Sequence, residues 1–341
     1  MRQLAIGIAG TAKNTGKTTT LNALYEALAG DATLNMALTS IGYDGESFDN
    51  VTGLPKPRVT VRAGMYAAVA KRCLAYSRAQ MEVLEDTGIQ TAMGNILIGR
   101  VSKPGKLIIS GPNKRKDLRT VLDRLKAHGA NLTLVDGALG RILPFVEMDG
   151  IILATGAARF ADINRLAGDT HAMLSLLSTP VLPAGSPALM ADSLLTDAAY
   201  EALLTRAQTA QTLTFSGVVM QKYLAKMARE PRLKGKRVLL SDPLKLLLAG
   251  MPQETLGALE ALRGLPAEVG VERSIRVLGL TINPYYPRYR INREDYEPAY
   301  VDRERLFEAL SAVSGVPCHD IVRQGVTALA DSVTALIKQQ A

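Results

Sequence analysis

The sequence predicts an α/β protein: a mostly parallel β-sheet with helices on both faces and an inserted antiparallel hairpin segment. Three observations predict it. Short apolar runs alternate with amphipathic helical patterns along the 341 residues, as in parallel sheets. A glycine-bearing polar loop joins the first apolar run to the first helical pattern, and the pattern changes between about residues 55 and 127. No internal repeat is visible, so we expect residues 1–341 to form a single elaborated domain with an insertion at about 55–127.

The apolar runs are short, rich in β-branched residues and bounded by turn residues, which is typical of buried strands. The strands expected from this pattern are 4–9, 37–41, 132–135, 150–154, 215–220, 238–240 and 277–282. Inside the insertion, residues 58–61 are expected to be extended and residues 65–84 to form a helix. Residues 96–101 and 106–109 are expected to pair as a hairpin around the turn 102–105.

The loop after the first strand has the composition of a phosphate-binding loop. Its expected nucleotide-contacting residues are Thr11, Ala12, Lys13, Asn14, Thr15, Gly16, Lys17, Thr18 and Thr19. In such loops backbone N–H groups wrap the phosphates, the lysine contacts the β- and γ-phosphates, and the following hydroxyl binds Mg²⁺. The usual pattern has a glycine six residues before the lysine; here Thr11 stands there and Gly10 comes one residue earlier.

Acidic residues at strand ends complete the expected site. Asp136 follows the apolar run 132–135 and precedes small residues, so its carboxylate is expected at the carboxyl edge of the sheet as a catalytic and Mg²⁺-binding group. Asp44 and Glu46 follow the second strand, and one of them is expected to orient the attacking water or complete the Mg²⁺ shell. The alternative for Asp44 is a turn-forming Asp-Gly pair.

The base is expected to be adenine. A guanine-reading Asn-Lys-x-Asp sequence is absent, because residues 113–117 (Asn-Lys-Arg-Lys-Asp) contain one residue too many and precede the acidic strand. Two amides that follow late strands compete for contact with the base, Asn283 and Gln221. ATP and Mg²⁺ are therefore the expected ligands.

Composition excludes several other classes. The net charge is +8, but the basic residues are spread along the chain and aromatic residues make up 5%, so we expect no nucleic-acid partner. Two distant cysteines and three scattered histidines favour a reducing cytoplasm over a disulfide framework or a zinc site. No apolar stretch is long enough for a membrane span. Cys318 and His319 are adjacent on an extended segment and point to opposite faces, which argues against a nucleophile–base pair.

With these residues assembled, the chain resembles the P-loop NTPases that include dethiobiotin synthetases, cobyrinic acid amide synthetases and nitrogenase iron-protein relatives. The loop is similar to the Gly-Thr-x-Thr-x-x-Gly-Lys-Thr pattern of dethiobiotin synthetases, and residues 135–140 are similar to their Glu-Gly-Ala-Gly-Gly segment. Thr15 stands where valine is usual, and Asp136 replaces glutamate. Deviant-loop members carry a lysine five residues before the loop lysine; here that residue is Ala12. The class allows a homodimer.

A closer resemblance is to the smaller subunit of the lysine 5,6-aminomutase reactivase, in residues 9–20, 40–46, 91–112 and 281–284. It implies a mechanochemical ATPase with a partner ATPase subunit and a cobalamin-dependent mutase as client. Residues 284–289 (Pro-Tyr-Tyr-Pro-Arg-Tyr) would suit a partner face, or form a rigid surface loop. Two alternatives stay open: an ATP-dependent ligase that activates a small carboxylate or amine, and a nucleotide-sensing module without turnover.

Overall fold

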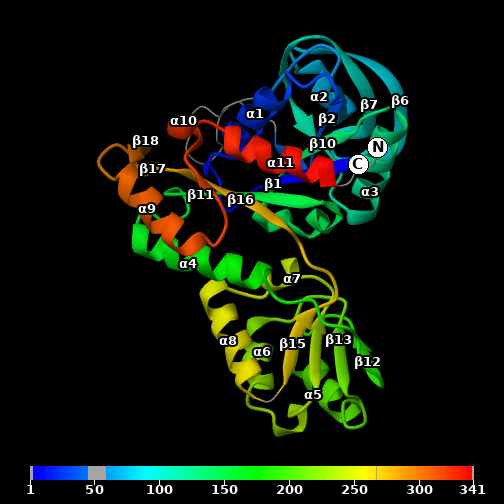
Figure 1. Cartoon of the computed structure of the whole chain (residues 1–341), viewed down its shortest axis with the longest axis vertical. Helices are drawn as coiled ribbons and strands as arrows, with labels where there is room; N and C mark the ends of the chain where they lie inside the picture. Colours follow the sequence, from blue (N-terminus) through cyan, green and yellow to red (C-terminus); the bar gives the residue numbers. More distant parts are fainter. Residues whose placement is uncertain (1–2, 45–58, 266, 340–341) are drawn as a thin grey trace. The chain divides into compact units, whose positions relative to one another are not determined.

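The structure, a computed structural model, describes residues 3–44, 59–265 and 267–339 (Figure 1). The chain divides into two compact units: Met1–Leu166 together with Arg276–Ala341, and Ala167–Ile275. We call these the first and the second unit, whereas from the sequence alone we expect a single elaborated domain. Helix α4 (Ile163–Leu177) begins in the first unit and continues in the second.

The first unit is built on a nine-stranded sheet, and the chain order of its strands shows repeated crossovers. In spatial order the strands are β19 (Cys318–His319), β16 (Val277–Asn283), β11 (Gly150–Gly156), β1 (Leu4–Gly10), β10 (Leu132–Ala138), β2 (Met36–Ser40), β5 (Tyr66–Ala70), β7 (Gly94–Lys103) and β6 (Gln80–Thr91). The seven strands from β19 to β5 are parallel, whereas β7 and β6 are antiparallel. The predicted fold class is therefore confirmed.

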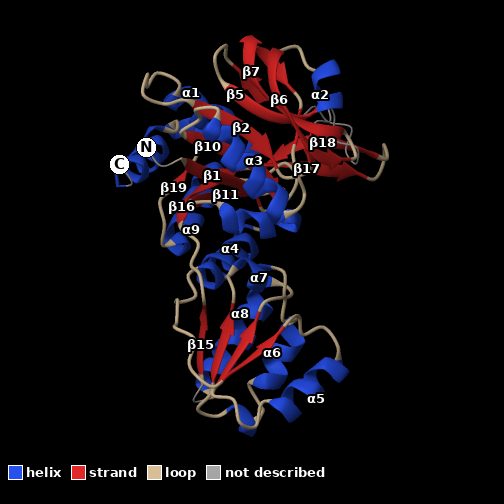
Figure 2. Ribbon diagram, turned by 90° about the vertical axis from the view of Figure 1, so that its right-hand side faces the viewer, coloured by secondary structure: helices blue, strands red, loops and turns tan. Residues whose placement is uncertain are grey.

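Helices cover both faces of this sheet (Figure 2). Because successive strand residues point to opposite faces, the sheet contributes to two separate apolar clusters. Helices α1 (Lys17–Leu28) and α11 (Thr327–Gln339) pack against Ile6 and Ile8 of β1. Helix α3 (Arg115–Ala127) packs against β5 and β7 in the other cluster. The remaining helices of this unit are α2 (Lys71–Ala75), η1 (Leu139–Arg141), η2 (Leu143–Glu147), α9 (Arg303–Ser314) and α10 (Ile321–Gln324).

One aromatic ring packs against two glycines of the central strands. Phe145 of η2 is fully buried and lies against Gly7 of β1 and Gly137 of β10. A Cβ on Gly7 would lie 2.2 Å from the Phe145 ring, and one on Gly137 would lie 2.4 Å from it. The two glycines are therefore required by packing.

The insertion contains antiparallel pairs, as predicted, although β5 also pairs in parallel with β2; the helix expected over 65–84 is wrong. That segment forms β5, the short helix α2 and the start of β6. The alanine- and valine-rich β5 is buried between β2 and β7, which it pairs with on either side. Tertiary pairing of a short apolar run overrides the helix propensity of alanine here.

The hairpin of the insertion also has a different partner. Strand β7 pairs with the preceding β6 around a turn at residues 92–93, and not with residues 106–109. Lys106 and Leu107 belong to β8 (Gly105–Leu107), which pairs with β4 (Val59–Val61). Ile109 belongs to β9 (Ile109–Ser110), which pairs with β3 (Tyr43–Asp44). Both pairings are antiparallel.

The second unit has its own parallel sheet, with the strand order β12 (Ala188–Ala191), β13 (Thr212–Phe215), β14 (Arg237–Leu240) and β15 (Glu268–Val271). Its other elements are α5 (Asp197–Arg206), α6 (Gln221–Met227), η3 (Pro231–Leu233), α7 (Leu244–Leu247) and α8 (Pro252–Gly264). The strand predicted over 215–220 lies earlier, at β13. After Phe215 the chain turns, because Gly217 approaches Ser193 so closely that a Cβ there would lie 2.1 Å from the Ser193 Oγ.

A two-stranded hairpin, β17 (Tyr285–Arg290) and β18 (Asp295–Tyr300), follows β16 within the first unit. Among residues 3–44, 59–265 and 267–339, no helix has the length and hydropathy needed to span a bilayer.

Candidate nucleotide-binding site

The predicted phosphate loop connects the end of β1 to the start of α1. Strand β1 ends at Gly10, and α1 begins at Lys17. Two loop residues adopt left-handed backbone conformations, Asn14 with φ 64° and Gly16 with φ 88°. Asparagine and glycine are the residues that tolerate this region best. The loop thereby makes its tight turn directly before the helix N-terminus, where the helix dipole favours an anion.

Neighbouring strands hold the loop in place. The Thr11 backbone N–H donates to the Ala154 carbonyl, and the Thr11 and Thr155 hydroxyls form a buried hydrogen bond of 2.9 Å. The Arg159 guanidinium donates to the Thr11 carbonyl at 2.7 Å. At the other end, the buried hydroxyls of Thr20 and Thr281 lie 2.8 Å apart. The loop is thus fixed by β11 and β16, and these partners carry no sequence motif that would reveal them.

Lys17 and Asp136 meet at the carboxyl edge of the sheet. The Lys17 Nζ lies 3.2 Å from the Asp136 Oδ2, and the two side chains are 11% and 2% exposed. The parallel register, which pairs Ile8 with Asp136, brings the two groups together. From the sequence we expect the Asp136 carboxylate at the carboxyl edge of the sheet; in the structure Asp136 lies within β10, which ends at Ala138. Its role as a metal ligand stays a prediction.

For the other predicted loop residues and acidic residues, the structure gives burial or backbone position and few side-chain contacts. Lys13 is exposed, whereas Ala12, Thr18 and Thr19 are partly buried; Thr15 is buried and its hydroxyl donates to the Ala12 carbonyl. The backbone of Asp44 lies on β3, opposite Ile109. Glu46 lies outside the described residues. Catalytic roles for Asp44 and Glu46 therefore stay predictions.

Asn283 contacts the phosphate loop directly. Its Nδ2 donates to the Asn14 carbonyl at 2.8 Å, and its Oδ1 accepts a hydrogen bond from the Tyr285 N–H at 3.2 Å. That Asn283 contacts the base of the nucleotide stays a prediction. The structure shows that it links the loop to Tyr285. The competing residue, Gln221, begins α6 in the second unit, where its N–H donates to the Ala249 carbonyl.

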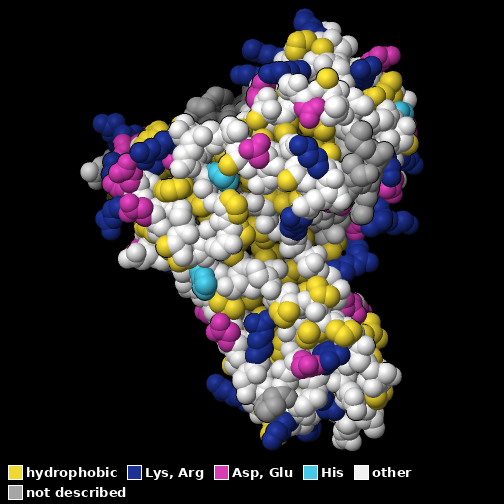
Figure 3. Space-filling model, viewed as in Figure 1, with side chains coloured by type: hydrophobic (Ala, Val, Ile, Leu, Met, Phe, Trp, Pro, Cys, Tyr) yellow, Lys and Arg dark blue, Asp and Glu magenta, His cyan; other side chains and the backbone are white. Residues whose placement is uncertain are grey.

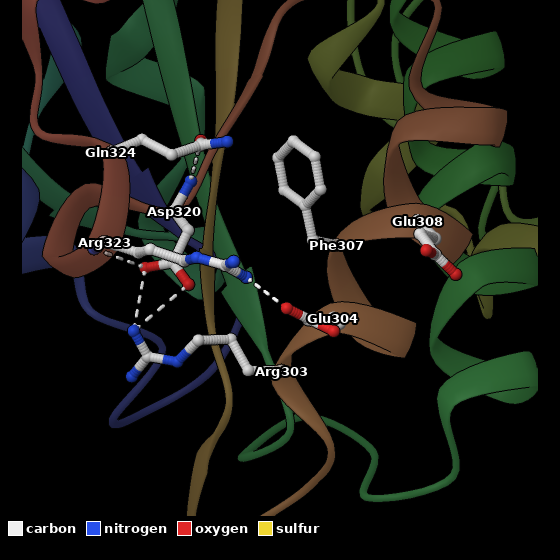
Figure 4. A pocket seen from close by; sticks show the side chains of 7 residues that line it. All are labelled: Arg303, Glu304, Phe307, Glu308, Asp320, Arg323 and Gln324. Carbon is white, nitrogen blue, oxygen red and sulfur yellow. Dashed lines mark hydrogen bonds and ion pairs between the residues drawn. The ribbon is translucent and has the colours of Figure 1, made fainter.

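A cleft of about 440 Å³ lies between α9 and α10 in the first unit (Figure 4). Its lining residues are Arg303, Glu304, Phe307, Glu308, Asp320, Arg323 and Gln324. Asp320, whose side chain is 2% exposed, pairs with Arg303, and Arg323 pairs with Glu304. The Phe307 ring projects from α9 into the cleft. Asp320 directly follows β19, the neighbour of β16, so the cleft opens at the same carboxyl edge as Asn283.

The described residues fit Mg²⁺ better than a metal held wholly by protein. Within the part of the chain that the structure describes, no group of three or more His, Cys, Asp or Glu side chains is arranged to hold a metal ion. Magnesium in nucleotide sites is bound by one or two protein oxygens together with phosphate oxygens and water. The Thr18 hydroxyl and the Asp136 carboxylate are oxygen donors of this kind.

Comparison with known proteins shows no matching family model and no matching curated protein. Among solved structures, the crystal structure of a ParA family ATPase from Chlorobium tepidum TLS is similar over 98% of this chain and 99% of that chain, at 9% identity and a TM-score of 0.29.

Proposed function

We propose that this chain binds Mg-ATP at residues 10–19 and hydrolyses it. The observation that carries the proposal is the Lys17–Asp136 ion pair of 3.2 Å at the carboxyl edge of a parallel sheet, directly behind a loop with left-handed turns at Asn14 and Gly16. A lysine at a helix N-terminus and a buried carboxylate on the adjacent strand are the parts that phosphoryl transfer requires.

In this proposal each residue of the site has a separate role. Lys17 leaves Asp136 and contacts the β- and γ-phosphates, while the loop backbone holds the phosphates against the helix dipole. Thr18 and Asp136 would hold Mg²⁺, which neutralises charge on the phosphate oxygens when bound. Release of Lys17 leaves the Asp136 carboxylate available to the metal.

We also assign the adenosine moiety to the cleft between α9 and α10. Its volume of about 440 Å³ is in the range of small-molecule sites, and Phe307 offers an aromatic face on which a base can stack, worth about 1–3 kcal/mol per base in other proteins. Phe307→Ala should therefore weaken ATP binding about 5- to 150-fold. Binding of inorganic triphosphate, which has no base, should be unchanged; an equal loss for both ligands would argue against this assignment.

The finer role that we propose is that of a reactivase subunit, which uses ATP hydrolysis to free a damaged cofactor from a cobalamin-dependent aminomutase together with a partner ATPase. The sequence resemblance in residues 9–20, 40–46, 91–112 and 281–284 supports it. Nucleotide-dependent order changes in the loop and at the ends of β2 and β10 would supply the switch.

The nucleotide site is tested by calorimetry with the purified chain. Lys17→Ala should weaken ATP binding about 10- to 150-fold, because it removes charge-assisted hydrogen bonds to phosphate. Lys116→Ala, which removes the same charge from an exposed position on α3, is the matched control and should bind like the parent. Unchanged affinity in Lys17→Ala would overturn the site.

The client is tested by phosphate release. We expect turnover with Mg-ATP to rise when an inactivated cobalamin-dependent mutase and its partner ATPase are added. Turnover that requires a small carboxylic acid instead would support an ATP-dependent ligase and refute the reactivase role. Binding without turnover under every condition would indicate a nucleotide sensor.

A further inference from the structure

The hairpin β17–β18 is a self-contained element at the edge of the nucleotide site. Its strands pair in continuous antiparallel register from Tyr285–Tyr300 to Arg290–Asp295. A hydrogen bond of 3.0 Å from the Val301 N–H to the Pro284 carbonyl closes its base. The chain enters it directly from Asn283 and leaves it into α9, which lines the cleft (Figures 1 and 4).

The two faces of the hairpin differ in chemistry, because strand residues alternate between faces. One face carries only tyrosine and proline: Tyr285, Pro287, Tyr289, Tyr296, Pro298 and Tyr300. On the opposite face Arg288 pairs with Glu297, and Arg290 pairs with Asp295. Acidic and basic side chains gather over this part of the molecule in Figure 3. Tyr285 contacts Tyr300 and Tyr289 contacts Tyr296 across the Tyr/Pro face, so side-chain contacts join the two strands on both faces.

Asn283 joins the hairpin to the phosphate loop. Its amide donates to the Asn14 carbonyl on one side and accepts from the Tyr285 N–H on the other. Its own carbonyl accepts from the Ala157 N–H at 2.9 Å. Gly16 packs against it, since a Cβ on Gly16 would lie 3.3 Å from the Asn283 Cβ. One side chain therefore spans from the loop to the first residue of the hairpin.

The bond to Asn14 has a stereochemical consequence. The Asn14 carbonyl and the Thr15 N–H belong to one planar peptide group, so a hydrogen bond to one fixes the direction of the other. Any rotation of that peptide, as when loop N–H groups turn toward a phosphate, changes the Asn283 contact. The same contact restrains Tyr285, so the coupling acts in both directions.

We propose that Asn283 couples occupancy of the phosphate loop to the position of the β17–β18 hairpin, which makes the hairpin the nucleotide-responsive element of this protein. The inference rests on the proposed function, because it takes the ligand to be a nucleotide. Asn283 acts here as a positioning residue, and the Tyr/Pro face is the surface whose position depends on the nucleotide.

The chain contains no tryptophan, so one introduced tryptophan reports on the hairpin alone. Tyr289→Trp places it on the Tyr/Pro face, at a residue that is 49% exposed. We expect its emission to change on addition of Mg-ATP or a non-hydrolysable analogue, and not with Mg²⁺ alone. Nucleotide binding is measured separately by calorimetry on the same sample.

We add Asn283→Ala or Asn283→Asp to the Tyr289→Trp protein. Both double variants should bind nucleotide about two- to tenfold more weakly than Tyr289→Trp alone, and the emission change at saturation should be lost. Asn283→Asp keeps the size and the acceptor and lacks the donor, and retained far-ultraviolet circular dichroism confirms folding. Asn95→Ala is the matched control: it removes an asparagine that bonds Asp86 in the insertion, and should respond like the parent reporter.

Three results would overturn the inference. One is a reporter that stays silent although calorimetry shows saturation; another is a full response in both Asn283 variants. If calorimetry shows no nucleotide binding at all, the proposed function fails, and this inference fails with it. The first two results leave the proposed function standing.

Discussion

At the scale of single residues, the Lys17–Asp136 pair is the central contact of the proposed nucleotide site. Both side chains are largely buried, and a buried charge without a partner destabilises a protein by several kcal/mol. Each group therefore neutralises the other in the folded protein. A substitution at Asp136 therefore tests the proposed metal-binding role most directly.

Asp136→Asn should reduce magnesium-dependent ATP hydrolysis by at least about 100-fold, because the amide replaces the charged oxygen that would hold the metal. Binding of ATP in the presence of a chelator should persist, since Lys17 and the loop remain. Asp331→Asn, at an exposed position on α11, serves as the control in phosphate-release assays. Hydrolysis at the parent rate in Asp136→Asn would contradict the assignment.

His319 predicts a pH dependence of stability. It is buried, and among the described residues its Nε2 has no hydrogen-bond partner; burial lowers its pKa below the ordinary 6.5. Between the two pKa values the unfolded state binds more protons, so the stabilisation is present above pH 6.5 and is lost as the pH falls. In His319→Gln the melting temperature should therefore drop less between pH 7 and pH 5.

Thermal melts at several pH values check this expectation. His171→Gln, at an exposed position of α4, should keep the parent's acid sensitivity. An unchanged slope in His319→Gln would show that other groups dominate the acid response.

At the scale of elements, the strands that carry the proposed nucleotide site were predictable and the pairing within the insertion was not. Residues 4–9 and 132–135 are apolar runs bounded by turn residues, and they form β1 and β10. By contrast, residues 65–84 have no period that separates helix from strand. They form β5, α2 and the start of β6. Strand β5 forms there because it pairs with β2 on one side and with β7 on the other, and both partners come from other parts of the sequence.

The contact of η2 with the sheet gives a prediction at this scale. Phe145→Ala should lower the free energy of unfolding by about 3–5 kcal/mol, because it removes a fully buried ring and leaves a cavity above Gly7 and Gly137. Leu143→Ala in the same short helix removes a side chain that is 38% exposed and should cost under about 1 kcal/mol. Urea denaturation compares them, and equal losses would refute the packing argument.

At the scale of the whole molecule, the chain consists of two units with separate sheets. The second unit repeats the parallel arrangement with its own core: Tyr223, fully buried, stacks on Tyr200 with ring centroids 5.7 Å apart. The proposed nucleotide site uses residues of the first unit alone. Multidomain proteins commonly depart from two-state unfolding, which leads to a prediction for this chain.

The cysteines distinguish the units, because Cys73 and Cys318 both lie in the first. Burial raises the pKa of each thiol to about 11, so the folded protein should react slowly with a thiol reagent near pH 8. We expect circular dichroism to show two thermal transitions and thiol labelling to follow one of them. Labelling that follows both transitions equally would show that the two units unfold together.

The sequence by itself determined the α/β class, the loop between β1 and α1 and the place of Asp136 on the strand β10, because each depends on local patterns of a few neighbouring residues. Only the tertiary structure decided which strands pair in the insertion, that the chain forms two units, and that Asn283 contacts the loop. These contacts join residues such as Asn14 and Asn283, which are 269 positions apart. Such contacts depend on sheet order and register, and no local pattern in a single sequence encodes them.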